Sequence, residues 1–294
     1  MKRLIVFIFY LFPLFLQAQT YDPNLFKHYV IPITKALDDT NSVLYDSLKN
    51  YNLIMIGENH GVKEYVQFMD GLIRDFTVHH KKVIAGFEVE RGIMHDSSKN
   101  LTYAQVANSD FFNQDIDGRE NSTMANIIAK LSNNSNVSLV FFDIRTNPIN
   151  RKQLKDTSKA FYVNYVGLYR DSMMYEALNG AIKKDTNAVA ISICGDYHSM
   201  IERKGAMAYF FKNDSASAIR NKRILTIKDV SETGTMLNNA GDGLQLRNVY
   251  PTSFFLDSIV QYDNYVLLTP YPLYNGYCGT LFIRTISAAM PCKN

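Results

Sequence analysis

The sequence predicts an α/β fold with a central, mostly parallel sheet that has helices on both faces and helical insertions. Two observations support this class. Five short runs are mostly apolar and β-branched, as is typical of strands covered on both faces, and they span 53–56, 83–89, 138–144, 188–194 and 224–227. Helix-length segments separate these runs, and such alternation is typical of parallel strands joined by helical crossovers.

The first two predicted strands and the segment between them form the best-defined unit. Apolar residues in 63–79 recur at helical spacing, and they include Tyr65, Phe68, Met69, Leu72 and Phe76. We therefore expect a βαβ unit here. Residues 101–131 are expected to form a helical insertion with a polar loop at 115–118, and 151–179 to form one or two further helices. Near the end of the chain, 265–268 and 280–285 are expected to add edge strands.

Residues 1–18 are predicted to be a secretory signal peptide. Lys2 and Arg3 form a short positive region, residues 4–16 are almost wholly apolar, and Ala18 offers a small residue for cleavage. The apolar run is shorter than the roughly 20 residues of a spanning helix, and no later segment approaches that length. We therefore expect no integral membrane segment in the mature chain, a periplasmic or secreted location in a bacterium, and a single domain over 19–294.

Composition excludes some classes of protein. Hydrophobic residues make up 47% of the chain, which is enough for a sizeable core and excludes a disordered protein. The net charge of +3 includes Lys2 and Arg3, which leave with the signal peptide. The mature chain is therefore almost neutral and has no dense basic block, so nucleic-acid binding has no support.

The three cysteines, Cys194, Cys278 and Cys292, lack the short spacing of a metal site. In an exported chain they allow one disulfide, for which Cys278 and Cys292 are the plausible pair. The alternative is that all three are packed thiols.

Polar side chains stand at the ends of four successive predicted strands. In chain order they are Glu58 and His60, Glu88 and Glu90, Asp143 and Arg145, and Asp196 and His198. Ligands of open α/β sheets bind outside the carboxyl ends of the strands, so we expect these side chains to converge at one edge.

Each of these residues also has a structural interpretation. Glycines 57 and 61 suit a tight turn in which Glu58 or Asn59 caps the helix that follows near Val62. A salt bridge to Arg91 or Arg145 would explain one of the second-strand glutamates without chemistry. Asp143 and Arg145 would likewise serve the scaffold if they paired only with each other.

The stretches "IMIGENHG", "AGFEVERG" and "ISICGDYHSM" resemble the superfamily that joins the erythromycin esterases, the ChaN-type haem-binding proteins and the Tiki/TraB proteins. The shared pattern is Gly-Glu-x-His, then a glutamate, then Gly-x-x-His, over roughly 53–201. The resemblance implies an EreA/ChaN-like fold. It maps the functional positions of the superfamily onto Glu58, His60, Glu88 and His198, with Glu90 as the reserve for Glu88. The single residue between Glu58 and His60 is closer to the ChaN and Tiki spacing than to the esterase spacing.

These residue types suit two ways of hydrolysing an ester, lactone or amide bond in a small-molecule or peptide substrate. In one, His60 is the general base toward water, Glu58 or Glu88 orients it, and His198 or Arg145 stabilises the oxyanion. In the other, His60, His198 and Glu88 bind a divalent metal that brings the pKa of bound water to around 7.

The competing class is a haem- or iron-binding protein of the ChaN type with no catalysis, in which the histidines offer the ligands. Aromatic residues that would wall a flat haem pocket are Tyr162, Tyr165, Tyr169, Phe111 and Phe112. The same residues also suit helix packing. A third interpretation is a retained fold with a degenerate site and a structural role.

Overall fold

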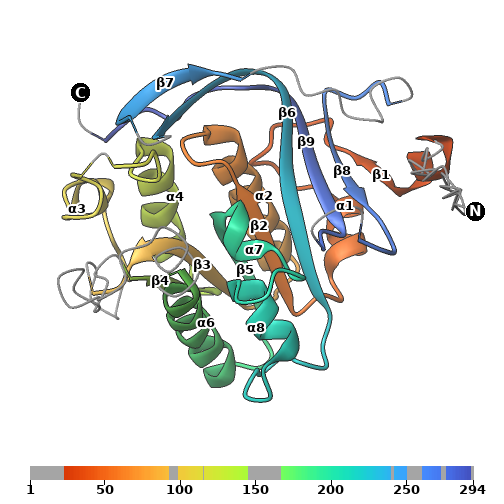
Figure 1. Ribbon diagram of the computed structural model, residues 1–294, viewed down its shortest axis with the longest axis horizontal. Coiled ribbons are helices and arrows are strands. Elements are labelled where there is room, and N and C mark those ends of the chain that lie inside the picture. The colour runs from red at the N-terminus through yellow and green to blue at the C-terminus, as the bar shows by residue number, and fades with distance from the viewer. Residues whose placement is uncertain are drawn as a thin grey trace, which may run out of the picture.

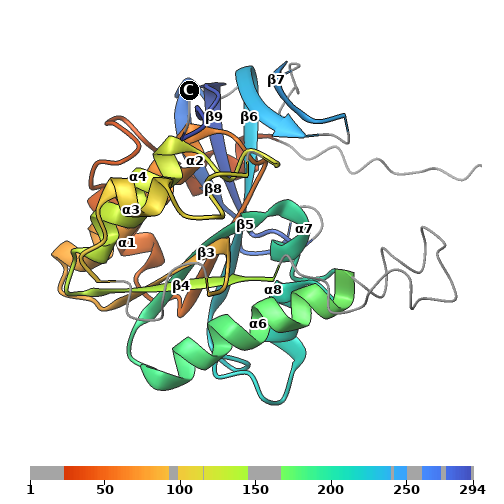
Figure 2. The ribbon, with the colours of Figure 1, turned by 90° about the vertical axis from the view of Figure 1, so that its left-hand side faces the viewer.

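The computed structural model describes residues 23–92, 99–114, 116–144, 167–239, 242–249, 260–272 and 276–292. The described residues form a nine-stranded sheet with helices on both faces (Figures 1 and 2). The predicted fold class, a mostly parallel sheet within an α/β fold, is confirmed. Three sequence predictions lie outside these residues: the signal peptide, Arg145, and the part of the predicted helical segment at 151–166.

The strands of the sheet keep the order β1-β8-β9-β6-β2-β5-β3-β4, and β7 pairs with β6. Their bounds are β1 Val30–Pro32, β2 Leu53–Glu58, β3 Val83–Glu90, β4 Val137–Asp143, β5 Val189–Gly195, β6 Ile224–Asn239, β7 Leu244–Asn248, β8 Asn264–Leu268 and β9 Gly279–Ile286. From β9 to β4 neighbouring strands run parallel, whereas β8, β1 and β7 pair antiparallel. The carboxyl ends of β2, β5, β3 and β4 therefore lie side by side, and Lys228 in the middle of β6 lies beside the end of β2.

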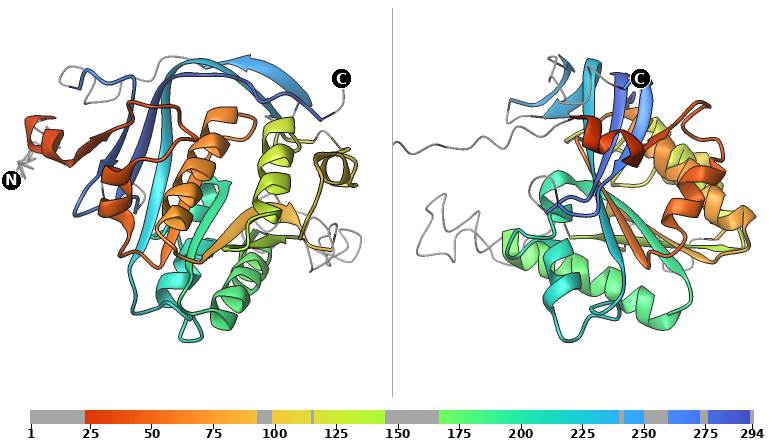
Figure 3. Two further views of the ribbon diagram at one scale, coloured as in Figure 1. Left: turned by 180° about the vertical axis from the view of Figure 1, so that it is seen from behind. Right: turned by 90° about the vertical axis from the view of Figure 1, so that its right-hand side faces the viewer.

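Helices cover both faces of the sheet. Their bounds are η1 Pro23–Tyr29, α1 Ser42–Leu48, α2 Lys63–Val78, α3 Tyr103–Ala107, α4 Ser122–Ser132, α6 Gly167–Lys184, α7 Asp196–Ser199 and α8 Met207–Asn213. Figure 2 shows α1 to α4 on one face and α6 to α8 on the other, and the left panel of Figure 3 shows α2 and α4 in front of the sheet. None of the helices in the described part of the chain is long and apolar enough to cross a membrane.

Each face of the sheet has its own core, because side chains alternate along a strand. Ile54 and Ile56 of β2 pack in the core under α2 and α4. Leu53 and Met55 of the same strand pack in the core under α6 and α8. This two-sided burial explains why the predicted strands read as continuous apolar runs.

The five apolar runs and the helix at 63–79 are found where the sequence predicts them. The expectation of edge strands near the end of the chain is wrong. β9 lies between β6 and β8, and β8 lies between β9 and β1, because the short β1 pairs antiparallel with β8 and takes the edge position. β6 also runs well beyond the predicted 227, since its second half pairs with β9 and with β7 in a hairpin.

The disulfide alternative for Cys278 and Cys292 is wrong, because no disulfide joins them in the described residues. The Cys292 thiol instead lies in hydrogen-bond contact with the hydroxyl of Tyr103. Cys194 is fully buried within β5, in the core under α6 and α8.

Candidate active site

The end of β2 holds a histidine–glutamate pair. Oε1 of Glu58 lies 3.2 Å from Nδ1 of His60, and the side chains are 3% and 20% exposed, respectively. A carboxylate there accepts the Nδ1 proton, which leaves Nε2 as the basic nitrogen. Burial opposes protonation of His60, but the hydrogen bond to Glu58 and the charge of Glu88 prevail and raise its pKa. Burial also raises the pKa of Glu58.

Two glycines, Gly195 and Gly61, shape the backbone around His60. An added Cβ on Gly195, at the end of β5, would lie 3.1 Å from Nε2 of His60, so the imidazole sits directly beside the backbone of the neighbouring strand. Gly61 has φ +82°, and an added Cβ there would meet the carbonyl oxygen of Leu237 at 1.7 Å. Only glycine fits this turn, which separates His60 from the start of α2.

Glu88 supplies the second-strand carboxylate of the site. It is 3% exposed, and its Oε1 accepts hydrogen bonds from Arg119 Nη1 at 2.8 Å and Arg170 Nη2 at 2.6 Å. Its Oε2 accepts the Gly195 N–H at 2.6 Å. Burial alone would raise the pKa of Glu88, but Arg119 and the other cations hold it well below the usual range. The reserve residue Glu90 is only half-buried.

Asp143, at the end of β4, completes a buried ion network. Arg170 donates to it twice, from Nε to Oδ1 at 2.7 Å and from Nη2 to Oδ2 at 2.8 Å. Arg119 Nη1 donates to Oδ2 at 2.9 Å and also binds Asp117. Two arginines therefore neutralise Glu88 and Asp143 together.

His198 follows β5, on the short helix α7. Its Nδ1 lies 2.7 Å from Oδ1 of Asp171, and its Nε2 lies 3.4 Å from Oε1 of Glu88 and 3.2 Å from Nη1 of Arg170. Burial lowers the pKa of His198, but the charges of Glu88 and Asp171 prevail and raise it to about 9. A pKa of about 9 favours the imidazolium at neutral pH, which places its positive charge beside Glu88 and Asp171.

The structure thus brings Glu58, His60, Glu88 and His198 to one edge of the sheet. Sequence reasoning missed the two arginines that hold this edge together, Arg119 and Arg170, as well as Asp171. The sequence did contain one indication of Arg119 and one of the pair Arg170 and Asp171. Arg119 directly follows the polar loop of the helical insertion, and the adjacent charges Arg170 and Asp171 interrupt an aromatic-rich helix.

A divalent metal does not fit His60, His198 and Glu88. Both oxygens of Glu88 already accept hydrogen bonds, and two guanidinium groups and an imidazolium surround it. These cations would repel a metal ion. Among the described residues no group of three or more His, Cys, Asp or Glu side chains could hold one.

The expected haem wall is also unsupported. Phe111 and Phe112 are 0% and 1% exposed and belong to the core under α2 and α4, so their helix-packing interpretation holds. Tyr169 is 37% exposed on α6. Tyr162 and Tyr165 lie outside the described residues.

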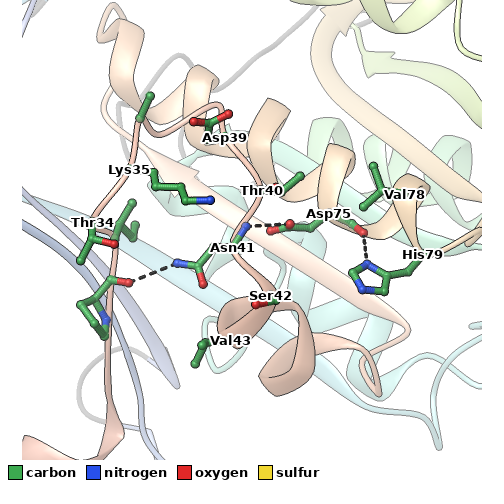
Figure 4. Close-up of a pocket in the computed structure, with 13 residues that line it drawn as sticks. Thr34, Lys35, Asp39, Thr40, Asn41, Ser42, Val43, Asp75, Val78 and His79 are labelled. Atoms are coloured by element: carbon green, nitrogen blue, oxygen red, sulfur yellow. Dashed lines mark hydrogen bonds between the residues drawn. The ribbon is translucent and has the colours of Figure 1, made fainter.

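A pocket of about 300 Å³ lies at the opposite edge of the sheet, between the segment after β1 and the last turn of α2 (Figure 4). Its polar groups already serve the fold. Oδ1 of Asp75 accepts the Asn41 N–H at 2.8 Å, and the His79 ring stacks on Tyr45 at 3.7 Å. None of the predicted site residues lines this pocket.

The fold and site define the class: an α/β protein whose carboxyl edge holds a histidine–glutamate pair beside an arginine–carboxylate network. No protein-family model matches the sequence, and no curated protein matches it. Solved structures do match in fold. A Bacillus cereus protein has a TM-score of 0.63 at 10% identity, covering 92% of this chain and 98% of that one. A succinoglycan biosynthesis protein has a TM-score of 0.65 at 10% identity, covering 91% and 97%.

A mutant of the erythromycin esterase EreC, in its open conformation, also matches. Its TM-score is 0.52 at 10% identity, with 86% of this chain and 95% of that chain covered. The resemblance predicted from the motifs is therefore confirmed at the level of the fold. A likeness to ChaN of Campylobacter jejuni, at a TM-score of 0.45, is too weak to support haem binding here. Fold alone does not transfer a substrate.

Proposed function

We propose that the protein is an exported hydrolase of an ester, lactone or amide bond in a small-molecule or peptide substrate, with His60 as a metal-free general base. The observation that carries this proposal is the hydrogen bond between buried Glu58 and Nδ1 of His60. It fixes one tautomer and leaves Nε2 free to accept a proton at the carboxyl edge of the sheet. The export part rests on residues 1–18 of the sequence.

The residues divide the chemistry as follows. Nε2 of His60 takes a proton from water while the oxygen of that water attacks the carbonyl carbon, and Glu58 stabilises the imidazolium that forms. The negative charge on the tetrahedral oxygen is stabilised by Arg170, which is 29% exposed, and by His198, which is 13% exposed. His60 then returns the proton to the leaving oxygen or nitrogen as the bond to carbon breaks.

Glu88 has a positioning role in this scheme. Its carboxylate binds Arg119, Arg170 and the Gly195 backbone, so it aligns β5 and the cationic groups with β3. It cannot also serve as a base, because both oxygens are engaged and its pKa is held well below the usual range by Arg119 and its other cationic neighbours.

Elemental analysis and an absorption spectrum of the purified mature protein, followed by assays on a panel of esters and lactones, test the proposal. We expect no stoichiometric metal, no haem band, and hydrolysis that resists a chelator and is lost in His60→Ala. Activity that a chelator removes and a metal restores would instead establish a metal-dependent enzyme. A haem band that disappears in the His60→Ala/His198→Ala double variant would establish the haem-binding alternative.

A further inference from the structure

A second pocket of about 300 Å³ opens beside the histidine–glutamate pair, where β6, β7, β9 and the start of α2 meet. It is lined by Asn59, Tyr65, Lys228, Asp229, Val230, Ser231, Met236, Asn248, Val249 and Ile286. Asn59 joins this pocket to the site, because it is the residue between Glu58 and His60. Its backbone N–H and its side-chain amide donate to Oδ2 of Asp229, at 2.8 and 3.1 Å.

Asp229 brings an incompletely satisfied carboxylate to the pocket. Its side chain is 0% exposed, and its Oδ1 has no hydrogen-bond partner among the described residues. Lys228 Nζ lies 3.8 Å from Oδ1, but the same ammonium is bound to Oδ2 of Asp196. Two carboxylates thus share one lysine, and the charge of Glu58 adds to the negative potential at Asp229.

A negatively charged Asp229 in these surroundings lowers the free energy of unfolding. Burial and the charge of Asp196 raise the pKa of Asp229 to about 7, so ionising it in the folded protein costs free energy. Glu88, by contrast, is balanced by two arginines. A buried acid with a spare oxygen facing an excess of negative charge is suited to bind a cation that arrives with a ligand.

The remaining lining completes the chemical description of the ligand. Met236, Val249 and Ile286 offer an apolar wall, and the Tyr65 hydroxyl lies in hydrogen-bond contact with Ser231 and with the carboxylate of Asp229. A group with a short apolar body and a cationic end fits this lining. Asn59 lines the pocket and directly precedes His60 in the chain, so the pocket adjoins the proposed general base.

We propose that this pocket is a substrate subsite for a protonated amine, with Asp229 as its counter-ion. The inference rests on the proposed hydrolase function, since it describes the substrate of the same site. It narrows the substrate to esters, lactones or amides that carry a basic amine near the bond to be cleaved.

Binding of benzylammonium at pH 8, measured by ligand-observed NMR titration, tests the subsite without catalysis. Benzyl alcohol is the matched neutral probe, since it keeps the ring and loses the charge. We expect benzylammonium to bind about tenfold more tightly than benzyl alcohol, and Asp229→Asn to remove this preference. Val249→Phe narrows the pocket without changing its charge and should weaken both probes.

Equal affinities for the two probes in the wild-type protein would overturn the subsite, and so would unchanged benzylammonium binding in Asp229→Asn. The wild-type comparison needs no variant, so a folding defect cannot leave the question open. His60→Ala should retain benzylammonium binding while it loses ester hydrolysis. If the wild-type protein hydrolyses none of the esters but still binds benzylammonium through Asp229, the hydrolase proposal fails and the amine site stands.

Discussion

The amino edge of the sheet, where the parallel strands begin, and the carboxyl edge, where they end, each have a pocket of about 300 Å³ with a buried aspartate. The two aspartates differ in their hydrogen bonding. At the amino edge, Oδ1 of Asp75 accepts the N–H of Asn41 and so ties α2 to the start of α1 (Figure 4). At the carboxyl edge, Asp229 keeps an oxygen without a hydrogen-bond partner among the described residues. Pocket size therefore does not distinguish the edges, whereas unbalanced polar groups do.

The histidines of the two edges differ in a similar way, since one packs within the fold and the other presents a ring nitrogen. At the amino edge, Nδ1 of His79 contacts the backbone oxygen of Asp75 and its ring stacks on Tyr45, so the side chain is committed to packing. At the carboxyl edge, His60 holds a carboxylate on Nδ1 and presents Nε2 beside Gly195. Loops that leave the carboxyl ends of parallel strands are free to carry such groups, because the strands beneath them already form the scaffold.

Removing one histidine from each edge tests this contrast with the largest expected effect. We expect His60→Ala to lower kcat/KM for a hydrolysed ester by about 10³-fold, in the range for loss of a general base. His79→Ala should change it by less than about twofold. Steady-state kinetics on both variants, with thermal unfolding as the control for folding, provides the measurement. Similar losses in the two variants would remove the functional distinction between the edges.

Removing one arginine from each edge sharpens the contrast in stability. Arg119→Ala leaves Glu88 and Asp143 buried with less compensation, and we expect it to lower the free energy of unfolding by about 3–5 kcal/mol. Arg74→Ala removes two longer contacts, to Asp39 at 3.7 Å and to Asp70 at 3.6 Å, and should cost less than about 1 kcal/mol because Lys130 still pairs with Asp70. Urea denaturation of both variants measures the difference. A loss below about 1 kcal/mol for Arg119→Ala would show that the network is dispensable.

The carboxyl edge also predicts a pH dependence. The pKa of His198 is raised to about 9 from 6.5, against burial, by Glu88 and Asp171, so its contribution is fully present below 6.5 and is lost as the pH rises through 9. Between pH 7 and pH 10 the wild-type protein should lose on the order of 2 kcal/mol through this group. His198→Gln should lack this part of the decline in urea-unfolding experiments. Parallel pH profiles would contradict the assignment of an imidazolium.

The smallest expected effect is the change in stability when Asp229 or Asp75 is replaced by asparagine. Because the pKa of Asp229 is raised to about 7 by burial and by Asp196, the wild-type protein loses stability as the pH rises from 3.8 through 7. Asp229→Asn should therefore be more stable than the wild type at pH 8 by on the order of 1 kcal/mol, and this difference should vanish near pH 4. Asp75→Asn should show a smaller gain, since the Asp75 carboxylate is stabilised by Asn41. Thermal unfolding of both variants and the wild type at pH 4 and pH 8 measures these differences. An Asp229→Asn variant that is less stable than the wild type at pH 8 would contradict the prediction.

Several site residues could be predicted because they follow strands whose apolar runs are legible in the sequence. Glu58, His60, Glu88 and His198 are found at the carboxyl edge, and their catalytic roles stay predictions. Arg119 and Arg170 were missed because neither follows a predicted strand, and they lie 31 and 82 residues from Glu88 in the chain. No local pattern shows that such distant charges will meet.

The sequence by itself determined the main strands and helices and the edge of the sheet at which the polar site residues lie. Apolar runs and helical spacing are local properties, and the parallel arrangement places strand ends together whatever their order. Only the tertiary structure decided that β5 lies between β2 and β3, which sets His60 against Gly195 and joins the Gly195 N–H to Glu88. It also decided which charges are balanced, because the burial and pairing of a side chain depend on neighbours that are remote in the chain.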